Sequence, residues 1–422
     1  MFDGARVLIV AATTGYQTRS FGEAAAKLGV RLVFATDRCD QIDDPWWDQA
    51  VPIRFHDEER SAADIVDAID GSPVRAVLAV GDRPTVIAAR VAETLGLPGN
   101  PPAAAHASRN KLASRIVLKA SGMAVPWFQA VMAKGDPLAL AEIVPYPCVL
   151  KPLSMSGSRG VIRADTRDGF VAAFNRVTAL LEQPDVRSER DAASDTLMIE
   201  AFIPGREYAL EGLLDRGMLR TLALFDKPDP LDGPFFEETI YVTPSALRQE
   251  DQARVSETVA AAARALGLRH GPVHAEVRVN ERGVYVLEVA ARPIGGLCSR
   301  ALRFTDDMSL EELLLRHALG HDVSQVAREP QASGVMMIPI PTRGIYRSVG
   351  GVEEARAVAA VDDIRITAKP DQVLVPLPEG KSYLGFIFAR GEEAGLVVQA
   401  LRDAHARLEF KIDREIRVVG RT

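Results

Sequence analysis

The N-terminal part of the chain alternates continuous apolar runs with stretches of helical periodicity. Residues 6–12 (RVLIVAA) and 31–37 (RLVFATD) are predicted as buried strands, and an amphipathic helical segment lies between them. A second unit follows, with an expected strand at 74–80 and a helix after the loop GDRP. Alternating helices and apolar strands are typical of a parallel sheet covered by helices on both faces. The sequence therefore predicts an N-terminal α/β domain over residues 1–105.

The pattern changes after the proline-rich segment 97–108, which is predicted as a loop. Ser108 is expected to cap a helix that ends at Gly122, and short strands, a glycine-rich loop and a helix over 167–182 follow. The charged segment 185–195 is expected to be mobile. These features predict a linker helix followed by a small second domain.

The second half of the chain is richer in alternating apolar segments, which are typical of strands. Helices are expected at 250–266 and 309–319, a hairpin at 273–290, and two further helical segments at 351–359 and 391–407. The last part is expected to be an appended α+β domain. The sequence therefore predicts a mixed α/β and α+β protein in four parts, over residues 1–105, 106–195, 196–328 and 329–422.

Composition narrows the class of protein. The 422 residues are 47% hydrophobic and 25% charged, as in soluble globular proteins, and no run approaches the roughly 20 apolar residues of a membrane helix. The net charge of −7 gives no general attraction for nucleic acid or an anionic membrane. The three cysteines, Cys39, Cys148 and Cys298, form no CxxC pair, so neither a disulfide framework nor a zinc knuckle is indicated. We therefore expect a cytoplasmic enzyme or a large soluble binding protein.

The hairpin 273–290 carries the strongest chemical signal. A register that pairs Asn280 with Val284 places Glu276 directly opposite Glu288. Directly opposed like charges destabilise a sheet by up to about 1 kcal/mol on an exposed face, so a compensating cation is expected. A hard divalent cation such as Mg²⁺ is one solution, and neutralisation by a neighbouring arginine at a solvated edge is the other.

A second signal follows the apolar strand that carries Lys151. The loop SMSGSRG (154–160) is rich in small residues, which let backbone N–H groups approach an anion closely. No GK[ST] sequence opens a helix here, so this is not the Walker phosphate loop, and a flexible surface turn is the alternative. Lys111, near the start of the linker helix, can point into a cleft between domains or into solvent. Glu200 lies inside an apolar strand, where a carboxylate needs a partner.

Taken in order along residues 1–325, these segments resemble the ATP-grasp superfamily. The matching segments are NKLASR, VLKPLSMSGSRG, MIEAFIPGREY, HAEVRV and LEVAARPIGG. The resemblance implies an ATP-grasp fold with an N-terminal domain, a lid and a third domain, and ATP bound between the last two. It also implies Mg²⁺ as the metal ion, with Mn²⁺ as an alternative.

The resemblance implies roles for individual residues, all around the nucleotide and the transferred phosphoryl group. The phosphate contacts are Lys111 and Lys151 with the loop of Ser156, Gly157, Ser158 and Gly160; the adenine hinge is Glu200, Ala201 and Ile203; the ribose contact is Glu207; the metal ligands are Glu276 and Glu288; and the arginine beside the transferred group is Arg292.

One position departs from the family. Many relatives have Asn two residues after the second metal glutamate, and Ala290 stands there in this chain. The hairpin register places His274 opposite Ala290, so His274 is a candidate catalytic residue beside Lys151 and Arg292, either as a metal ligand or by orienting a substrate. A hydrogen-bonded structural histidine is the alternative. The number of metal ions is left open.

The Arg-Pro-x-Gly-Gly ending and the C-terminal extension are similar to the L-amino-acid ligase branch. That resemblance implies an ATP-dependent carboxylate–amine ligase that forms an amide, most simply a dipeptide, through an acyl phosphate and releases ADP and phosphate. The segment 225–247 is expected to line the acceptor pocket, with Glu238 and Tyr241 as contacts, and Arg300 is a candidate for binding a carboxylate. A carboxylase, a purine-pathway ligase and a catalytically silent nucleotide-binding protein are the alternatives. The expected partners are small amino-acid substrates, with a homodimer compatible with the family and neither nucleic acid nor membrane involved.

Overall fold

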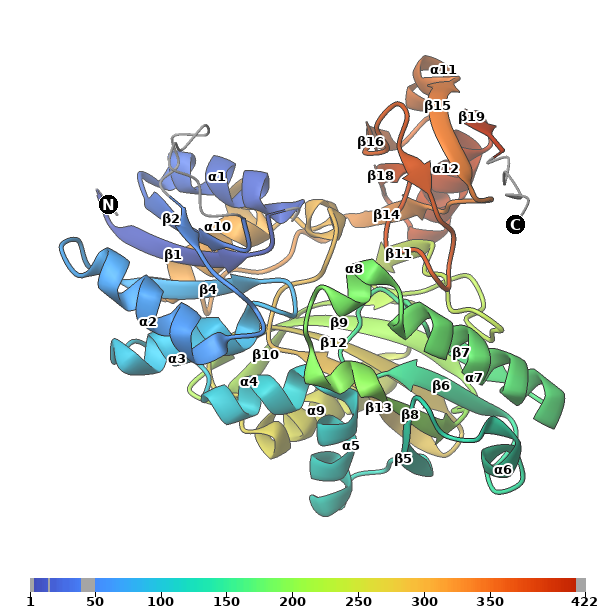
Figure 1. Cartoon of the computed structure of the whole chain (residues 1–422). Coiled ribbons are helices and arrows are strands. Elements are labelled where there is room, and N and C mark those ends of the chain that lie inside the picture. The colour runs from blue at the N-terminus through green and yellow to red at the C-terminus, as the bar shows by residue number, and fades with distance from the viewer. Residues whose placement is uncertain (1–3, 14–15, 39–49, 415–422) are drawn as a thin grey trace.

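The computed structural model describes residues 4–13, 16–38 and 50–414 of the chain. Its N-terminal domain is a parallel sheet in the order β3-β2-β1-β4 with helices on both faces, as the sequence predicts (Figure 1). Its elements are β1 (Arg6–Ala11), α1 (Gln17–Leu28), β2 (Arg31–Thr36), β3 (Val51–Pro52), α2 (Glu58–Ile69), β4 (Ala76–Val80) and α3 (Thr85–Thr94). Alternate residues of β1 face opposite sides, so Val7 and Ile9 pack with α1 while Leu8 and Val10 pack with α2 and α3.

Two short helices, rather than one, link this domain to the lid. α4 (Pro102–Arg109) forms inside the segment predicted as a loop, because Pro102 is well suited to a first helical position and an alanine run follows. α5 (Lys111–Ala120) begins after Asn110, whose side chain accepts two backbone N–H bonds of the first turn at 3.0 Å. Ser108, the predicted cap, lies in the last turn of α4 instead.

The lid is a four-stranded antiparallel sheet in the order β5-β8-β6-β7, packed against α7. β8 pairs with both β5 and β6, so the lid extends beyond the predicted boundary at residue 195. The segment 185–195, predicted to be mobile, contains helical turns instead. The lid elements are β5 (Phe128–Met132), α6 (Pro137–Ala141), β6 (Cys148–Pro152), β7 (Ile162–Ala164), α7 (Arg167–Leu181), α8 (Pro184–Arg187), η1 (Ala192–Asp195) and β8 (Thr196–Ala201).

An eight-stranded antiparallel sheet in the order β13-β12-β9-β10-β11-β14-β18-β16 forms the centre of the molecule. α9 packs on its β9–β12 half, and α10 leaves it to pack beside α1 on the N-terminal sheet. The elements before residue 329 are β9 (Arg206–Asp215), β10 (Met218–Asp226), β11 (Ile240–Thr243), α9 (Gln249–Leu266), β12 (Gly271–Asn280), β13 (Gly283–Ala290), η2 (Cys298–Ala301), η3 (Thr305–Asp307) and α10 (Leu310–Ala318).

The C-terminal extension forms the appended α+β domain that the sequence predicts, and it also continues this central sheet. Three of its strands follow β11, and α12 packs on them (Figure 1). A separate three-stranded sheet, β17-β15-β19, completes the extension. The elements of the whole extension are β14 (Ala332–Ile338), β15 (Gly344–Gly350), α11 (Val352–Arg356), β16 (Val361–Ile366), β17 (Val373–Leu374), β18 (Gly385–Gly391), α12 (Ala394–His405) and β19 (Glu409–Asp413).

The β12–β13 hairpin has the predicted pairing at its carboxylates and a different one at its tip. Glu276 lies opposite Glu288 as predicted, but Asn280 pairs with Gly283 rather than with Val284. A bulge directly after Glu276 absorbs the one-residue difference. The carboxylates therefore still face each other on one side of the sheet.

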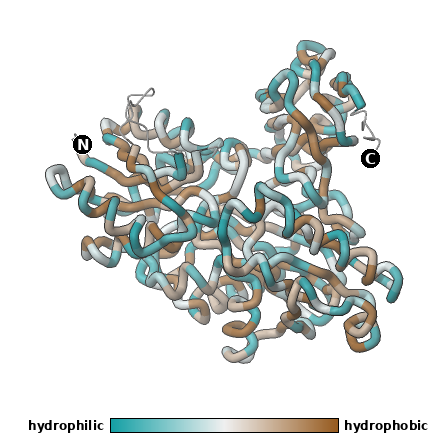
Figure 2. The backbone as a smooth tube through the Cα atoms, in the orientation of Figure 1, coloured by the Kyte–Doolittle hydropathy of each residue, from teal (hydrophilic) through white to brown (hydrophobic). Residues whose placement is uncertain are grey.

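Hydrophobic segments follow the buried strands, and hydrophilic segments lie mainly at the surface (Figure 2). Among the described residues, no helix is both long enough and apolar enough to cross a membrane. Cys148 and Cys298 are free, buried thiols, while Cys39 lies outside the described residues.

Candidate active site between the lid and the central sheet

A cavity of about 450 Å³ lies where the N-terminal domain, the lid and the central sheet meet. Its walls include the loops after β4 and β6, the β12–β13 hairpin and residues 381–383 of the extension. It brings together most of the site residues predicted from sequence. These are Lys111, Lys151, Ser156, Gly157, Ser158, Glu200, Ile203, Glu207, Glu238, Tyr241, His274, Glu276, Glu288 and Arg292.

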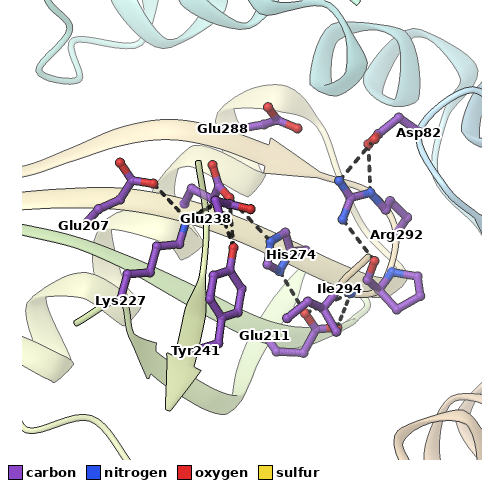
Figure 3. A network of polar contacts seen from close by, with 12 residues as sticks. Asp82, Glu207, Glu211, Lys227, Glu238, Tyr241, His274, Glu288, Arg292 and Ile294 are labelled. Atoms are coloured by element: carbon purple, nitrogen blue, oxygen red, sulfur yellow. Dashed lines mark hydrogen bonds and ion pairs between the residues drawn. The ribbon is translucent and has the colours of Figure 1, made fainter. Parts of the chain in front are cut away.

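Three carboxylates that line this cavity converge on one buried ammonium group in its wall (Figure 3). Lys227 Nζ lies 2.8 Å from Glu207 and 3.0 Å from Glu276, and it also donates to Glu238. The Tyr241 hydroxyl donates to Glu238 at 2.9 Å. Sequence reasoning missed Lys227, although this residue lies in the segment assigned to the acceptor pocket.

These contacts set the protonation states of the cluster. Burial alone lowers the pKa of Lys227, but the three carboxylates raise that pKa well above its ordinary value, so the ammonium stays charged. Burial likewise raises the pKa of a carboxyl, yet Lys227 and the hydrogen bonds hold the pKa of Glu276 well below its usual range. Burial, with the neighbouring Glu276 charge, raises the pKa of Glu238 to about 7. The cluster thus combines an ionised carboxylate with one that changes charge near neutral pH.

Glu276 and Glu288 fit a divalent cation. Both carboxylates line the cavity from directly opposed positions of the hairpin, and such hard oxygen ligands are those that Mg²⁺ takes. Each already has a protein counter-charge: Lys227 lies beside Glu276, and Lys111 Nζ lies 3.4 Å from Glu288 Oε2. The opposed charges inferred from the sequence are therefore compensated by lysines, and the two carboxylates remain available to a metal ion.

A buried carboxylate positions the second predicted lysine. Glu200 accepts hydrogen bonds from Lys151 and, at 2.9 Å, from Arg115 Nε. Arg115, which sequence reasoning missed, also donates to the carbonyl of Val286 at 2.9 Å. Burial alone raises the pKa of Glu200, but the two cations lower it to about 2. The Glu200 side chain therefore orients Lys151, whereas the sequence assigns this residue to the adenine hinge.

The loop after β6 adopts backbone conformations that favour small residues. Gly157, Ser158 and Gly160 have φ angles of 63°, 55° and 74°. A Cβ atom at Gly160 would lie 2.7 Å from Pro152, so this position requires glycine for space as well as for conformation. Gly160 itself does not line the cavity, unlike the other predicted residues of the loop.

The C-terminal extension holds this loop from outside. The Gly160 N–H donates to the carbonyl of Pro378 at 2.8 Å, and Arg159 Nε donates to the carbonyl of Glu379 at 2.8 Å. The Glu379 carboxylate also accepts two bonds from Arg176 of α7, at 2.5 and 2.9 Å. One segment of the extension thus binds both the lid loop and the lid helix.

The predicted hinge is organised around another arginine that sequence reasoning missed. Arg278 donates to the Ile203 carbonyl at 2.8 Å and to Glu207 at 3.1 Å. Phe202, whose ring lies 4.8 Å from the Arg278 guanidinium, also lines the cavity and gives it an aromatic surface. Ala201, the third predicted hinge residue, is not among the residues that line the cavity.

His274 lies opposite Ala290, as predicted, and its ring is held by two glutamates. Nδ1 lies 3.1 Å from Glu211 Oε2, and Nε2 lies 3.9 Å from Glu276. Burial alone lowers the pKa of His274, but these two glutamates raise it to about 9. An imidazolium has no lone pair for a metal ion, so the arrangement favours the orienting role over the metal-ligand role.

The N-terminal domain fixes Arg292. Asp82, in the loop after β4, accepts Arg292 Nε at 2.8 Å and Nη2 at 3.1 Å, a two-bond fork visible in Figure 3. Sequence reasoning missed Asp82, although its place at the carboxyl end of a predicted parallel strand is where such folds bind ligands.

Arg300 lies outside the cavity, contrary to the prediction. Its Nη2 is 3.5 Å from Asp363 of β16, and its guanidinium lies over the Phe388 ring at 5.8 Å. It therefore joins η2 to the extension rather than reaching a substrate.

Three family models match separate parts of the chain. They are the ATP-grasp N-terminal domain over residues 22–99, the ATP-grasp domain over residues 144–301 and L-amino acid ligase C-terminal domain 2 over residues 336–413. Carnosine synthase 1 of Gallus gallus is 25% identical over 360 residues, which are 80% of this chain and 38% of that protein. Alanine–anticapsin ligase of Bacillus subtilis (strain 168) is 27% identical over 241 residues, 54% of this chain and 50% of that protein.

This chain therefore spans less than two thirds of the length of these curated relatives. The crystal structure of L-amino acid ligase from Bacillus licheniformis matches with a TM-score of 0.82 at 25% identity, over 97% of this chain and 99% of that one. The chain belongs to the ATP-grasp family, and nearly its whole length has the architecture of an L-amino acid ligase.

Proposed function

We propose that the protein is an ATP- and Mg²⁺-dependent carboxylate–amine ligase that joins two amino acids. One observation carries the proposal: Glu276 and Glu288 oppose each other in a cavity that Lys111, Lys151 and Arg292 also line. Carboxylates that hold a cation and side chains that neutralise phosphate are the two requirements of phosphoryl transfer from ATP. The likeness to ligases that act on amino acids supports the choice of substrates.

The proposed reaction has two steps. A carboxylate oxygen of the first substrate attacks the γ-phosphorus of ATP, and ADP leaves. The amine of the second substrate then attacks the acyl carbon, and phosphate leaves with one of the original carboxylate oxygens. Bound Mg²⁺ supplies charge neutralisation at the phosphates. Lys151 and Arg292, oriented by Glu200 and Asp82, offset the charge on the transferred group.

The acceptor amine has candidate contacts within the carboxylate cluster and beside it. The Glu238 carboxyl and the Tyr241 hydroxyl both line the cavity there. The lid loop, held by the extension, suits a reaction whose acyl phosphate has to be protected from water.

The test incubates the chain with ATP, Mg²⁺ and pairs of unprotected amino acids, one of them labelled with ¹⁸O in its carboxylate. We expect equal amounts of ADP, phosphate and dipeptide, with one ¹⁸O atom in each phosphate when the labelled amino acid is the one whose carboxylate attacks ATP. Lys151→Met is expected to abolish this turnover, whereas Lys134→Met, at an exposed position of the lid, is the matched control. Absence of ADP with every pair, from a chain that folds normally, would contradict the proposal.

A catalytically silent nucleotide-binding protein is the second candidate, favoured by Ala290 in the position described above. It predicts that ATP with Mg²⁺ raises the midpoint of thermal unfolding without any ADP release. A bicarbonate-dependent release of phosphate that needs no amine would indicate a carboxylase instead.

A further inference from the structure

A second group of metal-ligating side chains lies at the opposite end of the strands that carry the cavity glutamates. Asp215 ends β9, His270 directly precedes β12, and His317 lies in the last turn of α10. One ligand atom from each lies within 4.8 Å of the others. Glu207 is eight residues from Asp215 on the same strand, about 27 Å away at roughly 3.4 Å per residue. This group is therefore separate from the candidate active site.

Both imidazoles face a single carboxylate oxygen without hydrogen-bonding to it. His270 Nδ1 and His317 Nε2 each lie 3.9 Å from Asp215 Oδ1. That separation exceeds the roughly 3.2 Å limit of a hydrogen bond. A metal ion with bonds of about 2.0–2.1 Å joins two ligand atoms about 3.4 Å apart at a tetrahedral angle. The two distances to Asp215 therefore exceed those of a coordination shell by about half an ångström, and the stacked rings also have to turn before all three groups can bind one ion.

His317 provides an independent indication of a ligand. Its side chain is 7% exposed, and its Nε2 atom is buried without a hydrogen-bond partner in the part of the chain that the structure describes. Buried polar atoms of this kind are rare in native proteins and point to a bound water or ion. Burial lowers the pKa of His270. Burial and the charge of the neighbouring His270 lower the pKa of His317 to about 4. Both imidazoles therefore have a free lone pair at neutral pH.

The group is accessible, and its backbone is fixed. The side chains of Asp215 and His270 are 65% and 18% exposed, which gives an ion a path from solvent. The two rings stack with centroids 4.4 Å apart and 24° between planes, so chelation requires them to turn until their lone pairs converge. A cavity of about 50 Å³ beside His270 gives that ring room to turn. The amide of Asn100 meanwhile bonds the His270 N–H and carbonyl at 3.0 and 2.9 Å.

We propose that Asp215, His270 and His317 bind a transition-metal ion such as Zn²⁺, with a further coordination position open to solvent. Two neutral imidazoles and one carboxylate suit Zn²⁺ or Co²⁺ better than Mg²⁺, which prefers oxygen ligands alone. The ion joins the ends of β9 and β12 to α10, which packs on the N-terminal sheet. It therefore links the central sheet to the N-terminal domain, and the inference stands whether or not the ligase proposal is correct.

The test is a Co²⁺ titration of the full chain, stripped of metal with a chelator and then held in excess Mg²⁺ to occupy the cavity carboxylates. We expect one Co²⁺ per chain with the visible absorption of a low-coordinate imidazole site, and displacement of that Co²⁺ by Zn²⁺. His317→Gln and Asp215→Asn should each weaken Co²⁺ binding by at least tenfold. His106→Gln, which removes an exposed imidazole from α4, should retain the parental affinity.

Circular dichroism of each variant separates loss of the site from loss of the fold, and the exposed Asp215 gives a variant that is expected to fold. Zn²⁺ should raise the midpoint of thermal unfolding of the parent chain but not that of His317→Gln. Unchanged Co²⁺ affinity in both ligand variants, or a folded parent chain that shows no Co²⁺ absorption, would overturn the proposal.

Discussion

The strand pair β9–β12 carries a cluster of ionisable groups at each end, and the two clusters are neutralised in different ways. In the cavity, the ammonium of Lys227 compensates Glu207, Glu238 and Glu276 from within the chain. At the far end, the exposed carboxylate of Asp215 meets two imidazoles without a hydrogen bond. Buried carboxylates need a counter-charge in order to be buried during folding, whereas neutral imidazoles need none and can bind an ion after the chain has folded.

The largest expected effect tests this difference through Lys227. Lys227→Met leaves three carboxylates without their ammonium partner, and we expect a loss of about 3–5 kcal/mol in the free energy of unfolding, measured with urea. The double variant Lys227→Met/Glu238→Gln should recover part of that loss because one charge is removed. In metal-free buffer, His317→Gln should cost no more than about 1 kcal/mol, since it replaces a neutral group. Equal losses in the free energy of unfolding for Lys227→Met and His317→Gln would contradict this difference between the two clusters.

The second prediction concerns the metal dependence of turnover. Glu276→Gln and Glu288→Gln should each lower kcat/KM for ATP by at least about 100-fold and raise the Mg²⁺ concentration needed for half-maximal rate. Glu281→Gln, in the exposed turn of the same hairpin, is the matched control. An unchanged Mg²⁺ requirement in both variants would remove these residues from the metal site.

The third prediction concerns the contact between the C-terminal extension and the lid over the cavity. Glu379→Ala removes the carboxylate that Arg176 of α7 binds, so the extension should hold the lid helix less firmly and the closed lid should admit water to the acyl phosphate. We expect phosphate release to exceed dipeptide formation by about two- to fivefold, against equal amounts in the parent chain. Asp413→Asn, which breaks an ion pair with Arg347 elsewhere in the extension, should leave the ratio unchanged.

The smallest effect is expected at Arg300. Because its guanidinium pairs with Asp363 outside the cavity, Arg300→Gln should change KM for either amino acid by less than about twofold, as partly exposed ion pairs of this kind contribute little. Steady-state kinetics with saturating ATP measures this. A large rise in KM for one substrate only would restore the carboxylate-binding role inferred from the sequence.

The features that could be predicted from sequence are those encoded by local order and spacing. Continuous apolar runs between helical segments predict the parallel strands, and the alternating runs of the hairpin place Glu276 opposite Glu288 even though a bulge changes the pairing toward the tip. The partners of these residues were not predictable in the same way. Asp82 and Arg115 come from segments far from Arg292 and Glu200, and only tertiary packing brings each pair together.

Some signals were present in the sequence but were not used. Glu207 and Glu211 are four residues apart in a strand, which places both on one face, and Glu211 proves to be the partner of His274. Pro102 followed by alanines is a helix start that the loop interpretation of 97–108 overlooked. Strand pairing also crosses the predicted boundaries at residues 195 and 328, because it joins segments that composition separates.

The continuity of the central sheet into the extension decides how this chain can be recombined with its relatives. A chimaera joined at residue 328 would break the pairing of Ile240–Thr243 with Ser333–Met336 and leave an open strand edge wherever the incoming register differed. Such hybrids are expected to aggregate rather than acquire a new substrate range. The natural unit of exchange therefore begins before β11 and carries the cavity residues Glu238 and Tyr241 together with the extension.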